Sequence, residues 1–249
     1  MEYSIVIPVY NESDKVVSTL NQVLDFMRGF SKSFEIIIVD DGSTDNTIEI
    51  IEEYIKSNHE IRLIKSSHKG KGPSVGYGVN NSHGEFVYMC DADLASPIDE
   101  LKKLSLWLKE HDYDIVIASR EGTGAVRVNE PWYRHFMGRV FNLLVRLLVL
   151  PGINDSQCGF KLFKGNVARE IFPKMVVYNS DSKDINTPYL GAFDVEFLYI
   201  ARIRGYKIKE LPVYWKYVRT TRLRPLNDSL KMSSDVIKIR LNGLKGVYK

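Results

Sequence analysis

Cysteine, net charge and long apolar runs are all scarce in this sequence of 249 residues. Its two cysteines, Cys90 and Cys158, cannot form the disulfide framework of a small secreted protein, and they suit a reducing compartment. The first apolar run, 5–9, is too short for a signal peptide. No run reaches the roughly 18–20 residues of a membrane-spanning helix, and the best candidate, 141–150, contains Arg146. We therefore expect a cytoplasmic globular protein with one large domain or two small ones.

The net charge of +3 hides an uneven distribution along the chain. Residues 216–249 contain nine basic and two acidic side chains, a net charge of +7, so the preceding part carries −4. A basic end predicts an anionic partner there, and a solvated helix face is the alternative. We expect no nucleic acid partner, because the part of the chain that carries the motifs described below is acidic.

Strand-like and helix-like segments alternate over the first two thirds of the chain. This alternation predicts an α/β fold with a mostly parallel central sheet and helices on both faces. Ligands bind such sheets at the carboxyl ends of the strands, so polar motifs that follow strands are the candidates for a functional site. The predicted strands are Tyr3–Val9, Phe34–Asp40, 61–66, 86–90 and 113–119, and the predicted helices are 13–30, 44–57, 73–81 and 97–110.

Polar motifs follow each of the first three predicted strands. They are 8–12 (PVYNE), 40–45 (DDGSTD) and 68–74 (HKGKGPS). The adjacent carboxylates of the second motif need hydrogen-bond donors, which a nucleoside could supply, and a capped turn with a solvated Asp41 is the alternative. The third motif opens a helix with glycines and lysines, a pattern that favours anion binding.

Asp91 and Asp93 follow the fourth predicted strand. Residues two apart in an extended segment point the same way, so the two carboxylates can converge on one hard cation. Mg²⁺ or Mn²⁺ held by one or two carboxylates takes its remaining ligands from water and substrate phosphates. The pattern therefore predicts Mg²⁺ or Mn²⁺ bound with a phosphorylated substrate.

Together these motifs resemble those of inverting glycosyltransferases of family 2, which have the nucleotide-sugar-binding GT-A fold. The segments that match the superfamily are 7–12 (IPVYNE), 39–45 (VDDGSTD) and 91–93 (DAD). A second set resembles dolichyl-phosphate glucosyltransferases and, more loosely, polyprenyl-phosphate mannosyl- and glucosyltransferases: 119–120 (SR), 155–163 (DSQCGFKLF), 192–196 (AFDVE) and 212–215 (PVYW). The resemblance covers residues 4 to about 215, and 121–131 and 176–190 match no pattern.

The resemblance implies a role for individual residues. Those that would bind the donor nucleotide are Pro8, Tyr10, Glu12, Asp40, Lys71 and Asp91. Asp91 and Asp93 would hold the metal on the diphosphate. Those implied in catalysis are Asp93, Asp155, Gln157 and Arg120. Those that would bind the acceptor phosphate are Arg120, Arg134, Arg219 and Arg222, the last two in a basic loop before the final helical segment.

The implied reaction is inverting transfer of a hexose, glucose by the best match, from a UDP-sugar to a polyprenyl or dolichyl monophosphate. A GDP-mannose-dependent polyprenyl-phosphate mannosyltransferase is one alternative. Another is a family 2 transferase that acts on a saccharide acceptor, with Asp155, Asp194 or Glu196 as base. A capping Asp194 and an exposed helical Glu196 are the structural alternatives. A non-catalytic nucleotide-sugar-binding protein also stays open.

Two helical segments predict contact with a membrane surface. The first, 132–150, has a broad apolar surface beside a narrow polar stripe, and a core helix or a dimer interface is the alternative, so a homo-oligomer stays open. The second, 226–244, has leucines on one face with lysines beside them, and docking on the catalytic domain is the alternative. We expect a catalytic domain over 1–217, a basic loop and amphipathic helix over 218–249, and peripheral association with the cytoplasmic face of a membrane.

Overall fold

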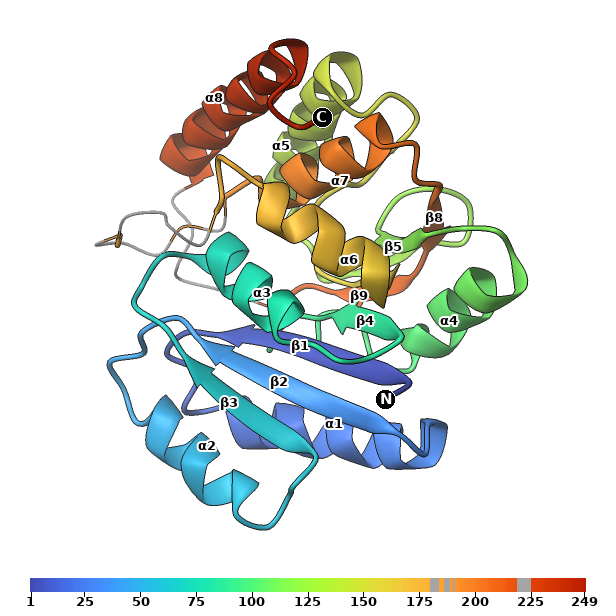
Figure 1. The fold of residues 1–249 in the computed structure, drawn as a ribbon. Coiled ribbons are helices and arrows are strands. Elements are labelled where there is room, and N and C mark those ends of the chain that lie inside the picture. Colours follow the sequence, from blue (N-terminus) through green and yellow to red (C-terminus); the bar gives the residue numbers. More distant parts are fainter. Residues whose placement is uncertain (180–183, 186–188, 190, 219–224) are drawn as a thin grey trace.

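The structure, a computed structural model, describes residues 1–179, 184, 185, 189, 191–218 and 225–249 (Figure 1). At its centre lies a seven-stranded sheet. The strands of this sheet are β1 (Tyr3–Val9), β2 (Phe34–Asp40), β3 (Ile61–Lys65), β4 (Phe86–Met89), β5 (Ile115–Ser119), β7 (Lys161–Lys164) and β8 (Ile208–Pro212). The helices are α1 (Val16–Phe30), α2 (Thr47–Ile55), α3 (Lys71–Asn80), α4 (Glu100–Glu110), α5 (Trp132–Leu148), α6 (Gly165–Ile171), α7 (Phe193–Ile203) and α8 (Pro225–Leu244).

The strands follow the order β3-β2-β1-β4-β7-β5-β8. All neighbouring pairs are parallel except those of β7, which runs antiparallel to both β4 and β5. The predicted α/β class and the mostly parallel sheet are therefore confirmed. Because β7 is reversed, its amino end lies at the edge of the sheet where its parallel neighbours have their carboxyl ends.

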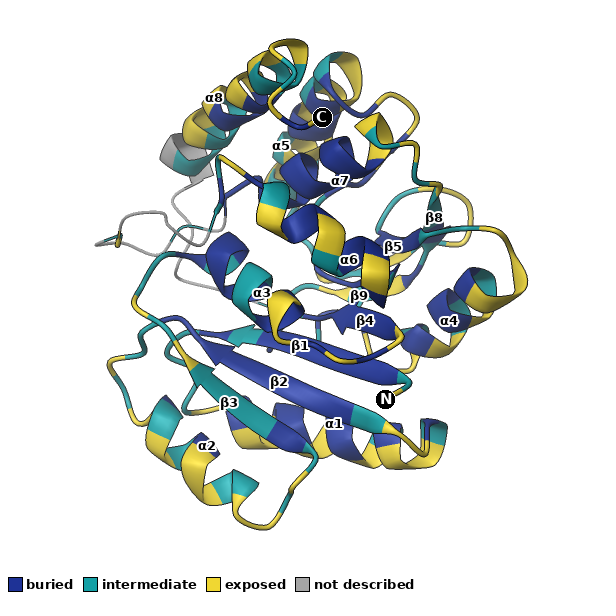
Figure 2. Ribbon diagram, viewed as in Figure 1, coloured by how far each residue is buried: buried dark blue, intermediate teal, exposed yellow. Residues whose placement is uncertain are grey.

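Two apolar cores separate the sheet from the helices on either face. Alternate residues of β1 point to opposite faces, with Ile5 and Ile7 in the core beneath α1, α2 and α4 and Val6 in the core beneath α3, α5, α6, α7 and α8. Figure 2 shows β1, β2 and β4 mostly buried and the outer sides of α1 and α2 exposed. This arrangement follows from the β-branched runs of the central strands, which are apolar on both faces.

The predicted bounds of β1 and β2 agree with the observed ones, and the other predicted elements differ at their ends by a few residues. The segment 121–131, which matched no pattern, contains a short strand, β6 (Val126–Val128). It pairs in parallel with β9 (Tyr214–Lys216) in a separate two-stranded sheet. This pairing brings two parts of the chain that are distant in sequence to one wall of the cavity described below.

Helices α5 and α8 pack on the domain and also expose apolar side chains. Phe141 and Val145 of α5 and Val236 and Ile239 of α8 are buried in the core, so docking of the final helix is observed. The exposed apolar residues are Trp132, Tyr133, Phe136, Val140, Leu143 and Leu147 on α5 and Leu230, Ile237, Leu241 and Leu244 on α8. In the part of the chain that the structure describes, we find no helix with both the length and the hydropathy needed to span a bilayer.

Candidate active site

A cavity of about 510 Å³ opens at the carboxyl ends of β1 and β4, where the sequence motifs are expected to meet. The predicted site residues that line it are Pro8, Tyr10, Glu12, Lys71, Asp91, Asp93, Arg120, Arg134 and Gln157. Asp40 and Asp155 are fully buried and do not line the cavity. Arg219 and Arg222 lie outside the described residues.

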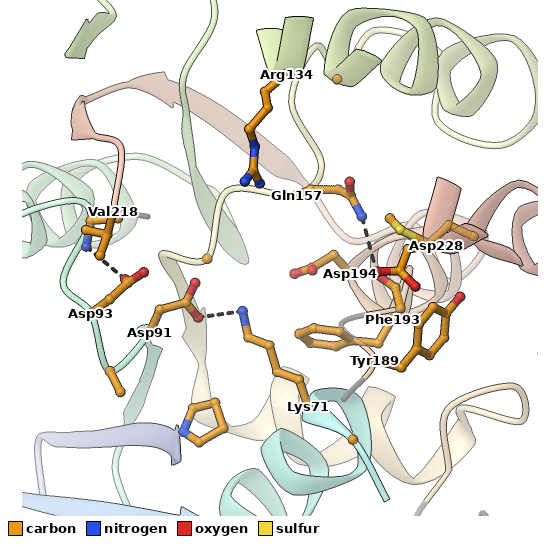
Figure 3. A pocket seen from close by; sticks show the side chains of 18 of the residues that line it. Lys71, Asp91, Asp93, Arg134, Gln157, Tyr189, Phe193, Asp194, Val218 and Asp228 are labelled. Atoms are coloured by element: carbon orange, nitrogen blue, oxygen red, sulfur yellow. Dashed lines mark hydrogen bonds and ion pairs between the residues drawn. The ribbon is translucent and has the colours of Figure 1, made fainter. Parts of the chain in front are cut away.

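One side of the cavity carries two carboxylates and a lysine (Figure 3). Lys71, the first residue of α3, places its Nζ 2.5 Å from Oδ1 of Asp91. Burial alone would lower the pKa of Lys71, but the charges of Asp91 and Asp194 outweigh it and raise this pKa, so the ammonium stays charged. The side chain of Asp93 is open to the cavity, yet the surrounding protein and the charge of Asp91 raise its pKa to about 6.

Asp41 organises the loop between β3 and α3. Its carboxylate accepts hydrogen bonds from the backbone N–H groups of Lys69 and Gly70 and from the hydroxyl of Ser74. Its Oδ2 also lies 2.8 Å from Nδ1 of His68. The solvated Asp41 of the alternative prediction is therefore wrong, because the side chain is buried and the loop supplies its hydrogen-bond donors.

Asp40 and Tyr10 lie at the neighbouring ends of β2 and β1. Oδ2 of Asp40 accepts hydrogen bonds from the backbone N–H groups of Gly42 and Ser43. Oδ1 of Asp40 is buried and has no hydrogen-bond partner among the described residues, a costly state unless a ligand donor reaches it. Tyr10 lines the cavity, and its ring stacks on that of His68 with 4.1 Å between the ring centroids.

Asp155 lies behind Arg120 and binds it with both carboxylate oxygens. Nε and Nη2 of Arg120 donate to Oδ2 and Oδ1 of Asp155 at 2.7 and 2.8 Å, and the backbone N–H of Arg120 donates to Oδ2 at 2.9 Å. Burial alone would raise the pKa of Asp155, but the charge and hydrogen bonds of Arg120 hold it well below its usual range. The guanidinium of Arg120 also lies 5.3 Å from the ring centroid of Trp215. Asp155 therefore orients Arg120 in the cavity wall.

Arg127 and Arg134 line the same side of the cavity, with different partners. Arg127 forms ion pairs with both Glu121 and Glu130. Arg134, on α5, donates a hydrogen bond of 3.1 Å to the hydroxyl of Tyr217 and stacks on its ring, 4.9 Å from the centroid. No carboxylate of the described residues pairs with Arg134, which points into the cavity (Figure 3).

Two carboxylates at the start of α7 are held by other parts of the protein. Oδ1 of Asp194 lies 2.5 Å from Nζ of the buried Lys161. Glu196 is fully buried and accepts hydrogen bonds from the backbone N–H groups of 176–178 and from the hydroxyl of Tyr248. Neither a helix-capping Asp194 nor an exposed Glu196 is observed, so both structural alternatives are wrong.

Comparisons with known proteins agree with this geometry. The family described as glycosyl transferase family 2 matches residues 4–172. The chain is 33% identical to a dolichyl-phosphate beta-glucosyltransferase of Dictyostelium discoideum, over 99% of this chain and 76% of the relative. It is 34% identical to a dolichyl-phosphate beta-glucosyltransferase of Saccharomyces cerevisiae, with the same coverage of 99% and 76%. The chain belongs to glycosyltransferase family 2. As predicted, it is an enzyme that transfers a sugar.

The fold of this family 2 enzyme also matches that of solved glycosyltransferases. One is glucosyl-3-phosphoglycerate synthase from Mycobacterium tuberculosis in complex with Mn²⁺, uridine diphosphate and phosphoglyceric acid. The two structures superpose with a TM-score of 0.64 at 18% identity, over 97% of this chain and 78% of the other. The likeness confirms the predicted GT-A fold.

The carboxylates of the family 2 enzyme fit a divalent cation. A Cβ atom at Gly159, just before β7, would lie 2.1 Å from Oδ2 of Asp91, so only a glycine there lets the carboxylate of Asp91 occupy its position. Among the residues described, no group of three or more His, Cys, Asp or Glu side chains is arranged to hold a metal. Two carboxylates such as those of Asp91 and Asp93 suit Mg²⁺ or Mn²⁺ when water and substrate phosphates supply the remaining ligands of the metal.

Several lining residues belong to none of the sequence motifs. They include Arg127, Glu130, Tyr189, Tyr217, Asp228, Ser229 and Met232. One sequence signal could have marked Tyr217, because residues two apart in a strand face the same way and Trp215 belongs to a matched motif. The others lie in segments whose place depends on tertiary contacts, such as the pairing of β6 with β9.

Proposed function

We propose that this enzyme transfers glucose from UDP-glucose to a polyprenyl or dolichyl monophosphate, with inversion at the anomeric carbon. In one displacement, an oxygen of the acceptor phosphate forms a bond to C1 of the sugar while the bond from C1 to the diphosphate breaks. UDP is the leaving group. The names of the relatives support glucose as the sugar and dolichyl phosphate as the acceptor.

The observation that carries the proposal is how the three carboxylates named as candidate bases for a saccharide acceptor are held. Asp155 is bound by Arg120, Asp194 by Lys161, and Glu196 by backbone N–H groups. A sugar hydroxyl would need a base to remove its proton, whereas a phosphate monoester, with a second pKa of about 6, is mostly ionised at neutral pH. Held in this way, the three carboxylates favour a phosphate acceptor over a saccharide.

The arginine side of the cavity supplies the charge that such an acceptor needs. Arg120 and Arg127 already face carboxylates, whereas Arg134 has a phenol and an aromatic ring as its described partners. We assign the acceptor phosphate to Arg134 first, with Arg120 beside it. A guanidinium offers paired donors to phosphate oxygens and positions the attacking oxygen without a change of its own protonation state.

The donor would lie at the other end, over the ends of β1 and β2. Pro8, Tyr10 and Glu12 line this wall of the cavity, and the buried, unpartnered Oδ1 of Asp40 would accept a hydrogen bond from the N–H of a uracil base if the wall opened to admit it. Lys71 adds positive charge where the diphosphate would lie. Asp91 and Asp93 would hold Mg²⁺ or Mn²⁺, which when bound stabilises the negative charge that develops on the leaving diphosphate. Gln157 lies where the sugar would bind.

A lipid acceptor also requires a surface that meets a bilayer. The exposed apolar residues of α5 and α8 supply one, with Trp132 80% and Leu147 75% exposed on α5 and Leu230 73% exposed on α8. Lys245, just past the end of α8, is exposed beside this row and suits anionic headgroups, where it contributes about 1 kcal/mol. We propose peripheral association through these two helices, at the cytoplasmic face.

The decisive experiment is transfer by the purified protein. It is incubated with Mg²⁺ or Mn²⁺, polyprenyl phosphate in vesicles, and radiolabelled UDP-glucose, UDP-N-acetylglucosamine or GDP-mannose, and the lipid fraction is analysed. We expect label from UDP-glucose in a lipid product with β configuration. If only GDP-mannose gives a labelled lipid, the donor is GDP-mannose and the assignment of UDP-glucose is wrong. No labelled lipid from any donor would overturn the proposed function.

A further inference from the structure

The buried side of α8 carries a carboxylate that is bound to the cavity wall. Asp235 is 4% exposed, and its Oδ2 accepts hydrogen bonds from the hydroxyls of Tyr178 at 2.7 Å and Tyr189 at 2.9 Å. Its Oδ1 accepts a hydrogen bond from Nζ of Lys238, one turn further along the helix, at 2.9 Å. Both tyrosines come from the connection between α6 and α7, so one side chain links the final helix to this connection.

Tyr189 lines the cavity, and Tyr178 is buried behind the segment 191–193. The hydroxyl of Tyr178 accepts a hydrogen bond from the backbone N–H of Ala192 at 2.7 Å. Gly191 has a φ of +69°, and a Cβ there would lie 2.5 Å from Cε1 of Tyr178, so the chain presses against this ring. Tyr189, Gly191 and Phe193 all line the cavity. Asp235 therefore holds the side chain of Tyr178 in place, and the segment 191–193 packs against that side chain.

This segment touches residues assigned to the reacting centre. The carbonyl of Gly191 accepts a hydrogen bond of 3.4 Å from Nε2 of Gln157. Nζ of Lys71, which pairs with Asp91, lies 5.7 Å from the ring centroid of Phe193. Figure 3 shows Gln157, Phe193 and Lys71 facing one space. A shift of the segment would move the groups that orient the donor.

We propose that Asp235 is a positioning residue for the transfer reaction, acting through Tyr178 and Tyr189 on the wall formed by 191–193. The proposal rests on the proposed function, because transfer is the reaction whose rate it affects. A buried carboxylate that binds two phenols contributes little to stability compared with a well-packed apolar side chain. The effect of Asp235 is to hold the segment 191–193 in one conformation. Transfer needs this single conformation because the segment positions the reacting groups.

The first test measures the wall itself and needs no catalysis. Amide hydrogen exchange over 191–194 is compared in the wild type, Asp235→Ala, Asp235→Asn and Tyr178→Phe. Tyr206→Phe is the matched control. The hydroxyl of Tyr206 donates a hydrogen bond of 2.6 Å to Glu170, and neither residue lines the cavity. We expect faster exchange in Asp235→Ala and Tyr178→Phe and wild-type exchange in the control. Wild-type protection in Asp235→Ala would overturn the proposal.

The second test asks whether the wall matters for turnover. We expect kcat to fall about 10-fold or more in Asp235→Ala, with the KM for the sugar donor nearly unchanged and partial recovery in Asp235→Asn, whose amide oxygen can still accept from the phenols. Titration with UDP and Mn²⁺ counts the folded sites. An undiminished kcat overturns the proposal, and so does a loss that equals the loss of UDP-binding sites, because that is a folding defect.

The two proposals fail separately. If the wild type transfers no sugar from any donor, the proposed function is wrong, and the exchange comparison still decides whether Asp235 holds the wall. If the wild type transfers sugar and Asp235→Ala does so at the same rate, only the role of Asp235 is wrong.

Discussion

The guanidinium of Arg134 stacks on the ring of Tyr217, 4.9 Å from its centroid, and the same phenol accepts its hydrogen bond. Stacking on an aromatic ring orients a guanidinium without neutralising it. Arg120, by contrast, is bound at both Nε and Nη2 by Asp155. Two arginines on one wall therefore differ in the charge that they can offer to an anion.

We expect Arg134→Ala to lower kcat/KM for the lipid phosphate about 10- to 100-fold, because a charge-assisted hydrogen bond to the acceptor is lost. Arg134→Lys should recover only part of this, since a lysine cannot bind two phosphate oxygens in a fork. The measurement is initial rate against acceptor concentration in vesicles. Arg28→Ala is the control, an exposed arginine on α1 that pairs with Glu60. Equal rates in Arg134→Ala and this control would show that Arg134 does not bind the acceptor phosphate.

We expect Asp93→Asn to reduce transfer about 100-fold or more, because the amide cannot replace the charge that binds the metal. Binding of Mn²⁺ in the presence of UDP, followed by calorimetry, should weaken in parallel. A chelator should abolish transfer by the wild-type enzyme, and added Mn²⁺ should restore that transfer. Asp99→Asn, at the exposed start of α4, should behave as the wild type. Metal binding that survives in Asp93→Asn would exclude the assigned ligand.

The pair of Arg120 and Asp155 predicts a loss of stability in acid. The folded-state pKa of Asp155 lies below its unfolded value of about 3.9, so the pair's contribution is complete above pH 4 and is lost as the pH falls further. Asp155→Ala should lower the free energy of unfolding at neutral pH by about 3–5 kcal/mol, since it leaves Arg120 without its partner. Urea unfolding at several pH values measures both effects.

In Asp155→Ala, the difference in stability from the wild type should narrow below pH 4, because the wild type then protonates the carboxylate that the variant lacks. A difference that stays constant across this range would show that the pair is not the source of the acid dependence.

The exposed rows of α5 and α8 predict which side chains hold the protein on vesicles. The double substitution Leu230→Ser and Leu241→Ser removes two exposed leucines without touching the buried side of α8. We expect the fraction that floats with anionic vesicles to fall at least several-fold, because the apolar area available to the bilayer shrinks. Leu106→Ser on α4, an equally exposed leucine on the opposite face of the sheet, is the control. Flotation that falls equally in the control would exclude the assigned surface.

Local patterns in the sequence predict the elements whose identity depends on few neighbours. The bounds of β1 and β2 follow from unbroken apolar runs, and the cavity residues Asp91 and Asp93 follow directly from the end of β4. The four-residue β7 was not predicted, because its partners on both sides come from other parts of the chain. The same holds for Asp155, whose motif does not reveal that Arg120 encloses it.

The final helix shows the same limit in another form. Its period predicts one apolar face, and Leu230, Ile237 and Leu241 of that face are exposed. Val236 and Ile239, which dock the helix, lie on another side of it, so the docking alternative is observed while the predicted apolar face stays exposed. A helical period shows which residues share a face and leaves open what covers that face.

The reversed strand β7 also has a consequence for how the molecule folds. The strands on one side of it, β1 to β4, are complete before the chain reaches residue 90, whereas β5 and β8 on its other side come later. The two halves of the sheet can therefore join only when a strand from the second half inserts between them. Strand pairings between residues this distant in sequence form slowly during folding. They also couple the two halves of the sheet, so that the halves unfold together. We infer that the end of the cavity where Gly159 meets Asp91 is assembled late in folding.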